Sequence, residues 1–115
     1  MRMIEDYSFG KIKIGGEIYT SDVIVYPDKV KGEWWRKEGH SLCIDDVREI
    51  LVYKPEILIV GTGAYGVMKV PDQVKKEIEE MGIKVIVTET KDACKLFNDY
   101  VKAGKKVVAA LHLTC

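Results

Sequence analysis

The sequence contains little of what catalytic and metal-binding sites usually need. Among 115 residues there are only two histidines, His40 and His112, and three cysteines, Cys43, Cys94 and Cys115. The cysteines stand far apart with no Cys-x-x-Cys pair, so we expect reduced thiols rather than a disulfide framework or a zinc site. No acidic or thiolate partner lies at helical or hairpin spacing from either histidine, and we therefore predict no metal site and no cofactor.

Net charge and long apolar runs are also missing. The 18 basic and 18 acidic side chains cancel, so the composition favours neither nucleic acid nor an anionic membrane as a partner. No segment approaches the ~20 apolar residues that a membrane-spanning helix needs, and the first residues do not have the pattern of a signal peptide. These absences predict a cytoplasmic protein.

Side-chain amides are nearly absent, since Asn98 and Gln73 are the single residues of their kinds, while charged residues make up 31% of the chain. Many charges and few thermolabile amides are typical of proteins from thermophiles. The length predicts one domain, residues 1–115, that buries about two thirds of the surface of its unfolded chain.

One stretch organises the rest of the chain. Pro55 ends any preceding helix, and residues 57–60 form an unbroken apolar run that predicts a strand buried on both faces. Glycines at 61, 63 and 66 follow at once and allow a sharp turn at the carboxyl end of that strand. Ligands bind at this end of strands in open α/β sheets.

The first third of the chain predicts antiparallel strands. Apolar runs at residues 9–14 and 18–26 flank two adjacent glycines, which is a strong hairpin signal. A two-residue loop would place Ile18 opposite Lys13, whereas a three-residue loop with a bulge would put three isoleucines of the hairpin on one face. We favour the second register because it buries more apolar surface.

A third antiparallel strand is predicted over residues 30–35, and it ends in two adjacent tryptophans. Successive side chains of a strand point to opposite faces, so Trp34 and Trp35 should lie on different sides. One should enter the core, and the other should line a cleft or a partner surface.

Strands and helices alternate in the second half. We expect right-handed crossovers between three parallel strands. The fold class is therefore mixed α/β, with a β-rich N-terminal hairpin layer packed on a small parallel βαβαβ layer that has helices on its outside. The expected elements are a helix capped by Asp45 and Asp46, the 57–60 strand, a helix over 71–81 with Val74, Ile78 and Met81 inward, a buried strand over 83–87, a helix capped by Thr90, and a strand over 106–113.

Residues 61–66 fit the G-x-G-x-x-G pattern, and Glu89 stands where a ribose-binding acid would be expected. The dinucleotide motif must open a helix directly, however, and residues 67–70 intervene before Pro71. We therefore favour a tight turn that needs glycine for its backbone conformation over a nucleotide site.

Other catalytic patterns have simpler explanations. His40, Ser41 and Asp45 suggest a hydrolase, but a polar loop with a capping serine explains them better. We expect His112 to be a hydrogen-bonded histidine of the core or of a sheet edge, and Cys94 to be a buried, inert thiol.

Several short pieces of the sequence occur in a characteristic order. They are Trp35-Arg36, Gly39-His40, Gly61 with Gly63, Lys69-Val70-Pro71, Thr90 with Ala93, Asn98, and the ending His112-Leu113-Thr114-Cys115. Together they resemble a family of small domains of unknown biochemical activity that includes the adipogenesis-associated protein of vertebrates and, more distantly, an assembly factor of mitochondrial respiratory complex I. The resemblance implies a β-rich domain with a small parallel layer and no established catalysis or cofactor.

Two clusters are candidates for a binding surface. One follows the carboxyl edge of the parallel strands, and the other is a polar and aromatic loop over residues 35–40. Whether they form one site is left open. The candidate residues are Trp35, Arg36, His40, Gly61, Thr62, Gly63, Lys69, Thr88, Thr90, Asn98 and His112.

Our leading hypothesis is a non-enzymatic cytoplasmic domain that binds a partner protein or assists assembly, with homo-oligomers allowed and no catalytic residues. The alternative is an enzyme or binding protein for a small anion or nucleotide that uses the edge at residues 61–66. We expect Arg36 to lie on an exposed functional loop; the structural alternative is that it pairs with a buried carboxylate such as Asp45 or Asp46.

Overall fold

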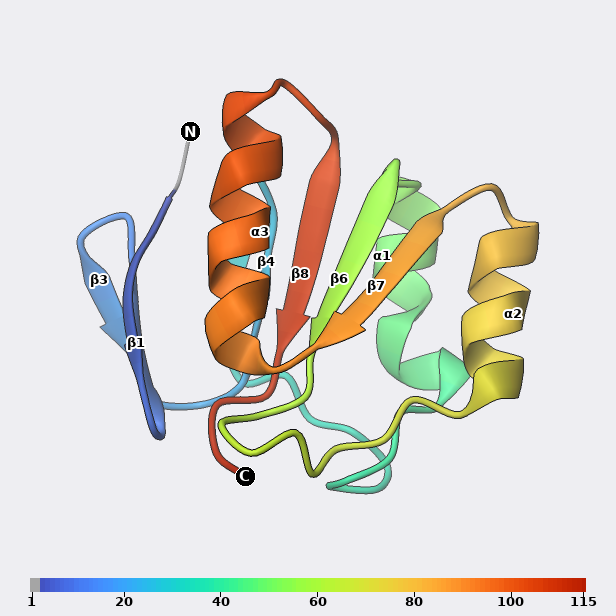
Figure 1. Ribbon diagram of the computed structural model, residues 1–115, viewed down its shortest axis with the longest axis horizontal. Helices are drawn as coiled ribbons and strands as arrows, with labels where there is room; N and C mark the ends of the chain where they lie inside the picture. The colour runs from blue at the N-terminus through green and yellow to red at the C-terminus, as the bar shows by residue number, and fades with distance from the viewer. Residues whose placement is uncertain (1–2) are drawn as a thin grey trace.

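A five-stranded mixed sheet forms the centre of the protein in the computed structural model, which describes residues 3–115 (Figure 1). Strands β6, β7 and β8 are parallel, as the alternation of strands and helices predicted, and β4 extends the sheet antiparallel to β8. The strand order is β5 (Val30–Lys31), β4 (Val23–Val25), β8 (Val107–Leu111), β6 (Ile57–Gly61) and β7 (Lys84–Thr88).

Helices cover both faces of this sheet. Helix α3 (Thr90–Lys102) packs on one face through Ala93, Phe97 and Val101. The other face is covered by helices α1 (Arg48–Tyr53) and α2 (Asp72–Glu80) (Figure 1). A short 3-10 helix, η1 (Ile44–Val47), leads directly into α1. Each face of β6 is therefore buried, because its side chains alternate between the two core clusters.

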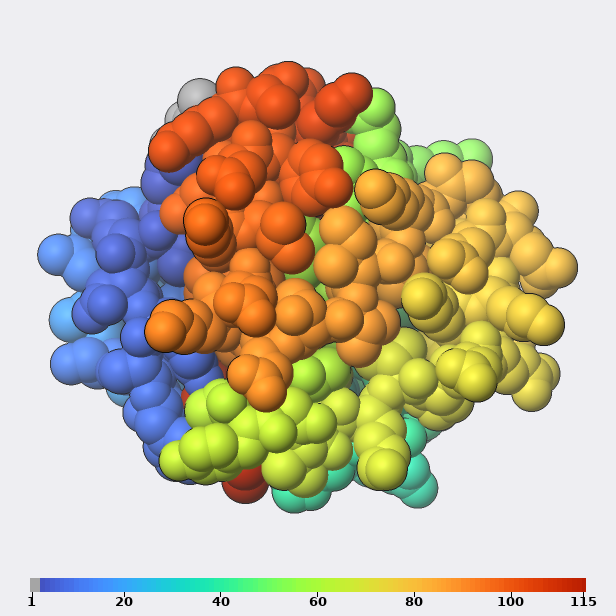
Figure 2. Space-filling model, viewed as in Figure 1, coloured from blue at the N-terminus to red at the C-terminus, as the bar shows by residue number. Residues whose placement is uncertain are grey.

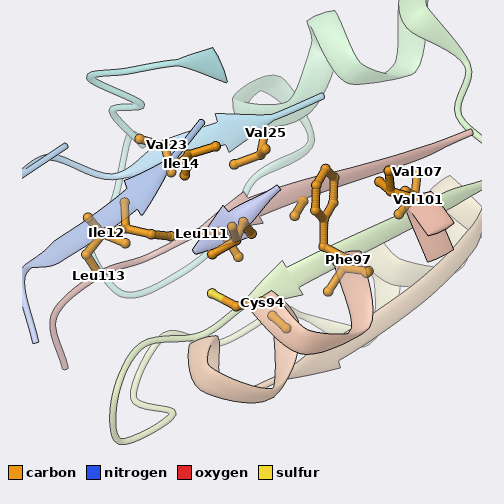
Figure 3. Close-up of a cluster of buried hydrophobic side chains, with 14 of the residues drawn as sticks. Ile12, Ile14, Val23, Val25, Cys94, Phe97, Val101, Val107, Leu111 and Leu113 are labelled. Carbon is orange, nitrogen blue, oxygen red and sulfur yellow. The ribbon is translucent and has the colours of Figure 1, made fainter. Parts of the chain in front are cut away.

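A second, three-stranded antiparallel sheet lies beside α3. It consists of β1 (Ile4–Ser8), β2 (Lys11–Ile14) and β3 (Glu17–Tyr19) in that order. Ile12 and Ile14 of β2 are fully buried and pack with β4 and α3 in the core cluster of Figure 3. The predicted β-rich N-terminal layer on a small parallel layer is thus confirmed.

The favoured register of the N-terminal hairpin is wrong. Lys13 pairs with Ile18 and Ile14 with Glu17, so the loop has two residues. Gly15 and Gly16 both have positive φ, +56° and +85°, a combination that matches the twist of a hairpin without a bulge. Ile18 therefore points away from the buried isoleucines and is 58% exposed.

Two predicted strands are shorter than expected. The run at 18–26 divides at residues 20–22 into β3 and β4, which belong to different sheets. The strand predicted over 30–35 pairs only at Val30–Lys31, and Glu33 then takes a left-handed φ of +53°. The two tryptophans still separate as predicted, with Trp34 buried at 3% exposure and Trp35 exposed at 75%.

Two predicted burials also differ from the structure. Strand β7 lies at the edge of the sheet rather than inside it, so Val87 is 39% exposed. Met81 is 57% exposed instead of inward because α2 ends at Glu80 and Gly82 then reverses the chain with a φ of +84°. Among residues 3–115, no helix is both long and apolar enough to cross a membrane.

Candidate functional site

The Asp22 carboxylate is the centre of a buried ionic network. Its Oδ2 lies 2.8 Å from Arg36 Nη2 and 2.8 Å from His112 Nδ1, and its Oδ1 accepts a 2.7 Å hydrogen bond from the Leu113 amide. The side chains of Arg36, Asp22 and His112 are only 5%, 15% and 7% exposed. The network fixes the start of β4, the loop after β5 and the segment after β8 to one another.

Arg36 is therefore buried, and the expectation that it lies on an exposed loop is wrong. Its guanidinium also donates to the Gly39 carbonyl and lies over the Trp34 ring, with Cζ 4.7 Å from the ring centre. Its Nη1 is buried and has no hydrogen-bond partner among the residues that the structure describes. The anticipated structural alternative holds, but the carboxylate is Asp22 rather than Asp45 or Asp46.

The two aspartates named in that alternative have other partners. Asp45 accepts from the exposed Lys37 and Arg48 side chains. Asp46 accepts a 2.8 Å hydrogen bond from the Cys43 amide and so stabilises the start of η1. Both lie inside η1, whose N-cap is Cys43, so neither is the N-terminal cap that the sequence predicted.

Hydrogen bonds determine the charge of Asp22 and the tautomer of His112. Burial raises the pKa of Asp22, but hydrogen bonds from His112, Leu113 and Arg36 outweigh that effect and hold the pKa below its usual 3.8. Because an ionised carboxylate only accepts, the network assigns the hydrogen to Nδ1 of His112. In neutral His112, Nε2 is then an acceptor, and it lies 3.5 Å from Thr114 Oγ1.

A cavity of about 350 Å³ opens above this network. The candidate residues Trp35, Arg36, His40 and His112 all line it, together with residues of the 20–22 connection and Thr114. The His40 ring meets the His112 ring edge to face at 5.7 Å between centres. The cavity therefore has an aromatic rim, hydroxyl groups in its wall and an ionic floor.

Trp35 also borders a second hollow of about 350 Å³ on the side of α1. Charged residues of both signs line that hollow, including Lys37, Asp45 and Arg48. Trp35 thus forms a ridge between two depressions, and the backbone on each side of it is fixed, since Trp34 donates to the Asp46 carbonyl and Arg36 pairs with Asp22.

The glycine turn is filled by the end of the chain. The Ala64 and Val67 amides donate to the carbonyls of Thr114 and Cys115. At Gly63, with a φ of +106°, an added Cβ would lie 2.6 Å from the Thr114 and Cys115 backbone. These amides already have partners, so the turn cannot cradle a phosphate as it stands, and the expectation of a tight turn that requires glycine is supported.

Thr90 joins the three parallel strands at their carboxyl ends. Its buried hydroxyl accepts from the Gly63 amide at 2.8 Å and donates to the His112 carbonyl at 2.6 Å. It is the first residue of α3 rather than the predicted cap. Thr62 similarly donates to the Thr88 carbonyl at 3.0 Å, so these threonines hold the turn in place.

The two candidate clusters meet through Lys69. Its amide donates to the His40 carbonyl at 2.8 Å, and its carbonyl accepts from Leu42 at 2.9 Å. The 35–40 loop, the glycine-turn segment and the 112–115 segment therefore form one continuous end of the molecule, which is the lower end in Figure 2.

Asn98 does not belong to this end. Its side-chain amide binds both main-chain groups of Ile4, at 2.9 and 2.8 Å, and joins α3 to β1. Asp22 and Thr114 line the cavity but were not among the predicted site residues. Asp22 was hidden because residues 18–26 were treated as one strand, although Ser21-Asp22 is a polar interruption of that run.

The remaining polar and thiol residues offer no metal site. No group of three or more histidine, cysteine or acidic side chains within residues 3–115 is arranged to hold a metal ion. All three cysteines are free thiols, and burial raises the pKa of Cys94 to about 12, which matches the expected inert thiol.

Comparison with known proteins gives a consistent result. A family model described as "Protein of unknown function (DUF498/DUF598)" matches residues 4–112. A conserved hypothetical protein from Pyrococcus horikoshii is 30% identical over 97% of this chain and 98% of its own, with a TM-score of 0.82. The protein MT938 is 27% identical over the whole of both chains, also at 0.82. A Mth938-like domain from Bordetella pertussis shares the fold at 16% identity, over 97% and 85% of the two chains, with a TM-score of 0.78.

Proposed function

We propose that this chain is a non-enzymatic domain that binds a partner protein. The chain belongs to the DUF498/DUF598 family of proteins of unknown function, which includes the adipogenesis-associated protein and a respiratory complex I assembly factor. The binding surface is the end of the molecule formed by the 35–40 loop, the glycine turn and the 112–115 segment. The single observation that carries the proposal is the exposed ridge made by Trp35.

Three properties of this tryptophan favour recognition. Its side chain is 75% exposed, so it does little for the core. The residues before and after it are fixed by buried contacts, so little backbone entropy is lost when a partner binds. Tryptophan next to pockets is typical of the few side chains that dominate binding energy in protein interfaces.

A second exposed aromatic pair lies at the same end. Phe9 and Tyr65 are 57% and 72% exposed, and their ring centres are 6.1 Å apart. They border the 112–115 segment, because Gly10 donates to Leu113 and Ala64 to Thr114. Exposed aromatics on both sides of this segment, with charges of both signs nearby, suit a protein partner better than nucleic acid.

Capture from a cell lysate with three immobilised proteins tests this function. The parent and Val52→Ala, which alters an equally exposed apolar side chain on α1, should enrich the same partner, and Trp35→Ala should lose most of it. Melting curves should show that all three fold. If the three proteins enrich identical sets, the proposal is wrong.

A small-molecule ligand is the second candidate, and the cavity at His40 and His112 favours it. The cavity volume of about 350 Å³ lies within the range of known ligand sites, roughly 300–1,000 Å³. A thermal-shift screen of carboxylates, phosphates and nucleotides checks it, since a ligand at a hundredfold excess over its Kd should stabilise by ~2.7 kcal/mol. A hit that His40→Ala abolishes would support this candidate, and a flat screen would contradict it.

A further inference from the structure

A groove separates β1 from α3, away from the Trp35 surface. Its walls are four consecutive residues of β1, Ile4 to Tyr7, and one face of α3, and it holds about 320 Å³. Figure 2 shows β1 (blue) and α3 (orange) side by side along this boundary. A groove between an edge strand and a helix is the geometry in which extended peptides add to a sheet.

The edge of β1 that faces α3 already binds the side-chain amide of Asn98. Within residues 3–115, strand β1 is the end strand of its sheet and pairs only with β2. On its other side, the Asn98 side chain donates to the Ile4 carbonyl and accepts from the Ile4 amide. A side-chain amide thus takes the place that a main-chain peptide group of a neighbouring strand would occupy.

The edge continues past Asn98 to Tyr7. Ser8 and Lys11 flank the two-residue turn of the β1–β2 hairpin, so their main-chain groups face each other. Successive residues of an antiparallel strand direct their main-chain amide and carbonyl alternately towards the partner strand and away from it. The main-chain groups of Tyr7 therefore point away from β2 and towards the groove. None of the hydrogen bonds found outside the regular elements of residues 3–115 uses the Tyr7 amide or carbonyl.

The helix wall carries two unpaired cations. Lys91 and Lys95 line the groove, and neither takes part in any of the salt bridges between described residues. Their i, i+4 spacing makes them repel each other on the helix surface. Lys91 is also the second residue of α3, where the helix dipole favours an acid. The position of Lys91 therefore does not favour the helix.

We infer that the groove between β1 and α3 binds an extended segment of another protein that carries acidic side chains. The segment pairs with the free main-chain groups of Tyr7, and its acidic side chains face Lys91 and Lys95. On the strand wall, Glu5 is directed elsewhere, since it accepts from the Gly16 amide at the β2–β3 turn. Asp6 also lines the groove, so the lining sets two lysines against one further carboxylate and keeps an excess of positive charge. This inference does not depend on the function proposed for the Trp35 surface.

Titration of the ¹⁵N-labelled protein with two synthetic heptapeptides, one alternating valine and glutamate and one alternating valine and lysine, tests the inference. The glutamate peptide should shift the amide signals of Tyr7 and of α3 and should bind at least about tenfold more tightly than the lysine peptide. Equal binding of both peptides, or no saturable shifts up to millimolar peptide, would overturn the inference.

Charge reversal gives the matched control. The double variant Lys91→Glu, Lys95→Glu should reverse the preference and bind the lysine peptide. Lys75→Glu, Lys76→Glu, which makes the same change of charge on α2, should keep the preference of the parent. If both double variants behave alike, net charge rather than the groove explains the binding, and the inference fails.

Discussion

Single residues at the carboxyl end of the sheet have structural roles that their sequence context hides. Arg36 follows an exposed tryptophan and precedes charged residues, so it looks like a surface residue. Its partner Asp22 is 14 positions earlier, and the antiparallel pairing of β4 with β5 brings the two segments together. Pairing over such distances depends on tertiary structure and leaves no local pattern.

Replacing Arg36 should be much more damaging than replacing its neighbour. Arg36→Ala leaves Asp22 buried without its cation, and we expect a loss of about 3 kcal/mol or more. Lys37→Ala removes an exposed ion pair with Asp45 and should change the stability far less, because water and salt screen such pairs. Urea unfolding of both variants measures the difference, and equal losses would contradict the buried network.

The acid stability of the protein should depend on Asp22. Because its pKa is lowered in the folded state, the stability it contributes is present above its ordinary pKa and is lost as the pH falls through the folded pKa. Asp22→Asn should therefore be less stable at neutral pH and lose less stability as the pH falls from about 4 downwards. Unfolding curves across this range check it, with the exposed Asp28→Asn as control. A variant that kept the full acid dependence of the parent would refute the assignment.

The glycine turn should tolerate no side chain. Gly63→Ala combines a positive φ with a backbone clash at 2.6 Å, and at Gly61 an added Cβ would lie 2.9 Å from the Thr90 hydroxyl and 3.2 Å from its Cα. We expect each change to cost more than about 1 kcal/mol, with Gly63 the worse. Gly39→Ala meets open space without a positive φ and should be neutral in the same denaturation assay. Neutral Gly61 and Gly63 variants would show that the turn can move.

At the scale of elements, the periodicity of apolar residues predicted most helices and strands. The register of the N-terminal hairpin was set instead by the backbone conformation of its turn. The apolar run at 57–60 and the helical stripe of α3 each reflect burial along one element, which a sequence displays directly. The register of the hairpin depended on two adjacent glycines that favour positive φ at both positions, and this preference outweighed the burial of Ile18. The division between β3 and β4 depended on which sheet each strand joins, which is a tertiary property.

Asn98 should act as the joint between the two sheets. Asn98→Ala leaves both main-chain groups of Ile4 without partners, so we expect a loss of about 1–3 kcal/mol. Hydrogen exchange of β1 and β2 should accelerate more than that of β6 and β8. Asp99→Ala, an exposed neighbour on the same helix, should leave both unchanged. Uniform acceleration in Asn98→Ala would mean that the two sheets unfold as one unit.

At the scale of the whole molecule, the sequence predicted which residues lie at the carboxyl ends of the parallel strands. It did not predict how the segments at these ends pack against one another. The sequence placed the glycines, Thr88 and Thr90 at the carboxyl ends of parallel strands, and the structure has them there. It did not show that the chain end fills the turn, or that the 35–40 loop joins this end through Lys69. The open part of the surface is therefore the Trp35 ridge, because the glycine turn is already occupied.

A photo-crosslinking amino acid in place of Trp35 tests the central claim most directly. The matched control carries the same amino acid in place of Val52, which is 84% exposed on α1. Illumination in cells of the source organism, followed by mass spectrometry, should give a discrete adduct with one protein from position 35 and none with that protein from position 52. The same adducts from both positions, or none from position 35, would contradict a partner-binding surface at this end of the molecule.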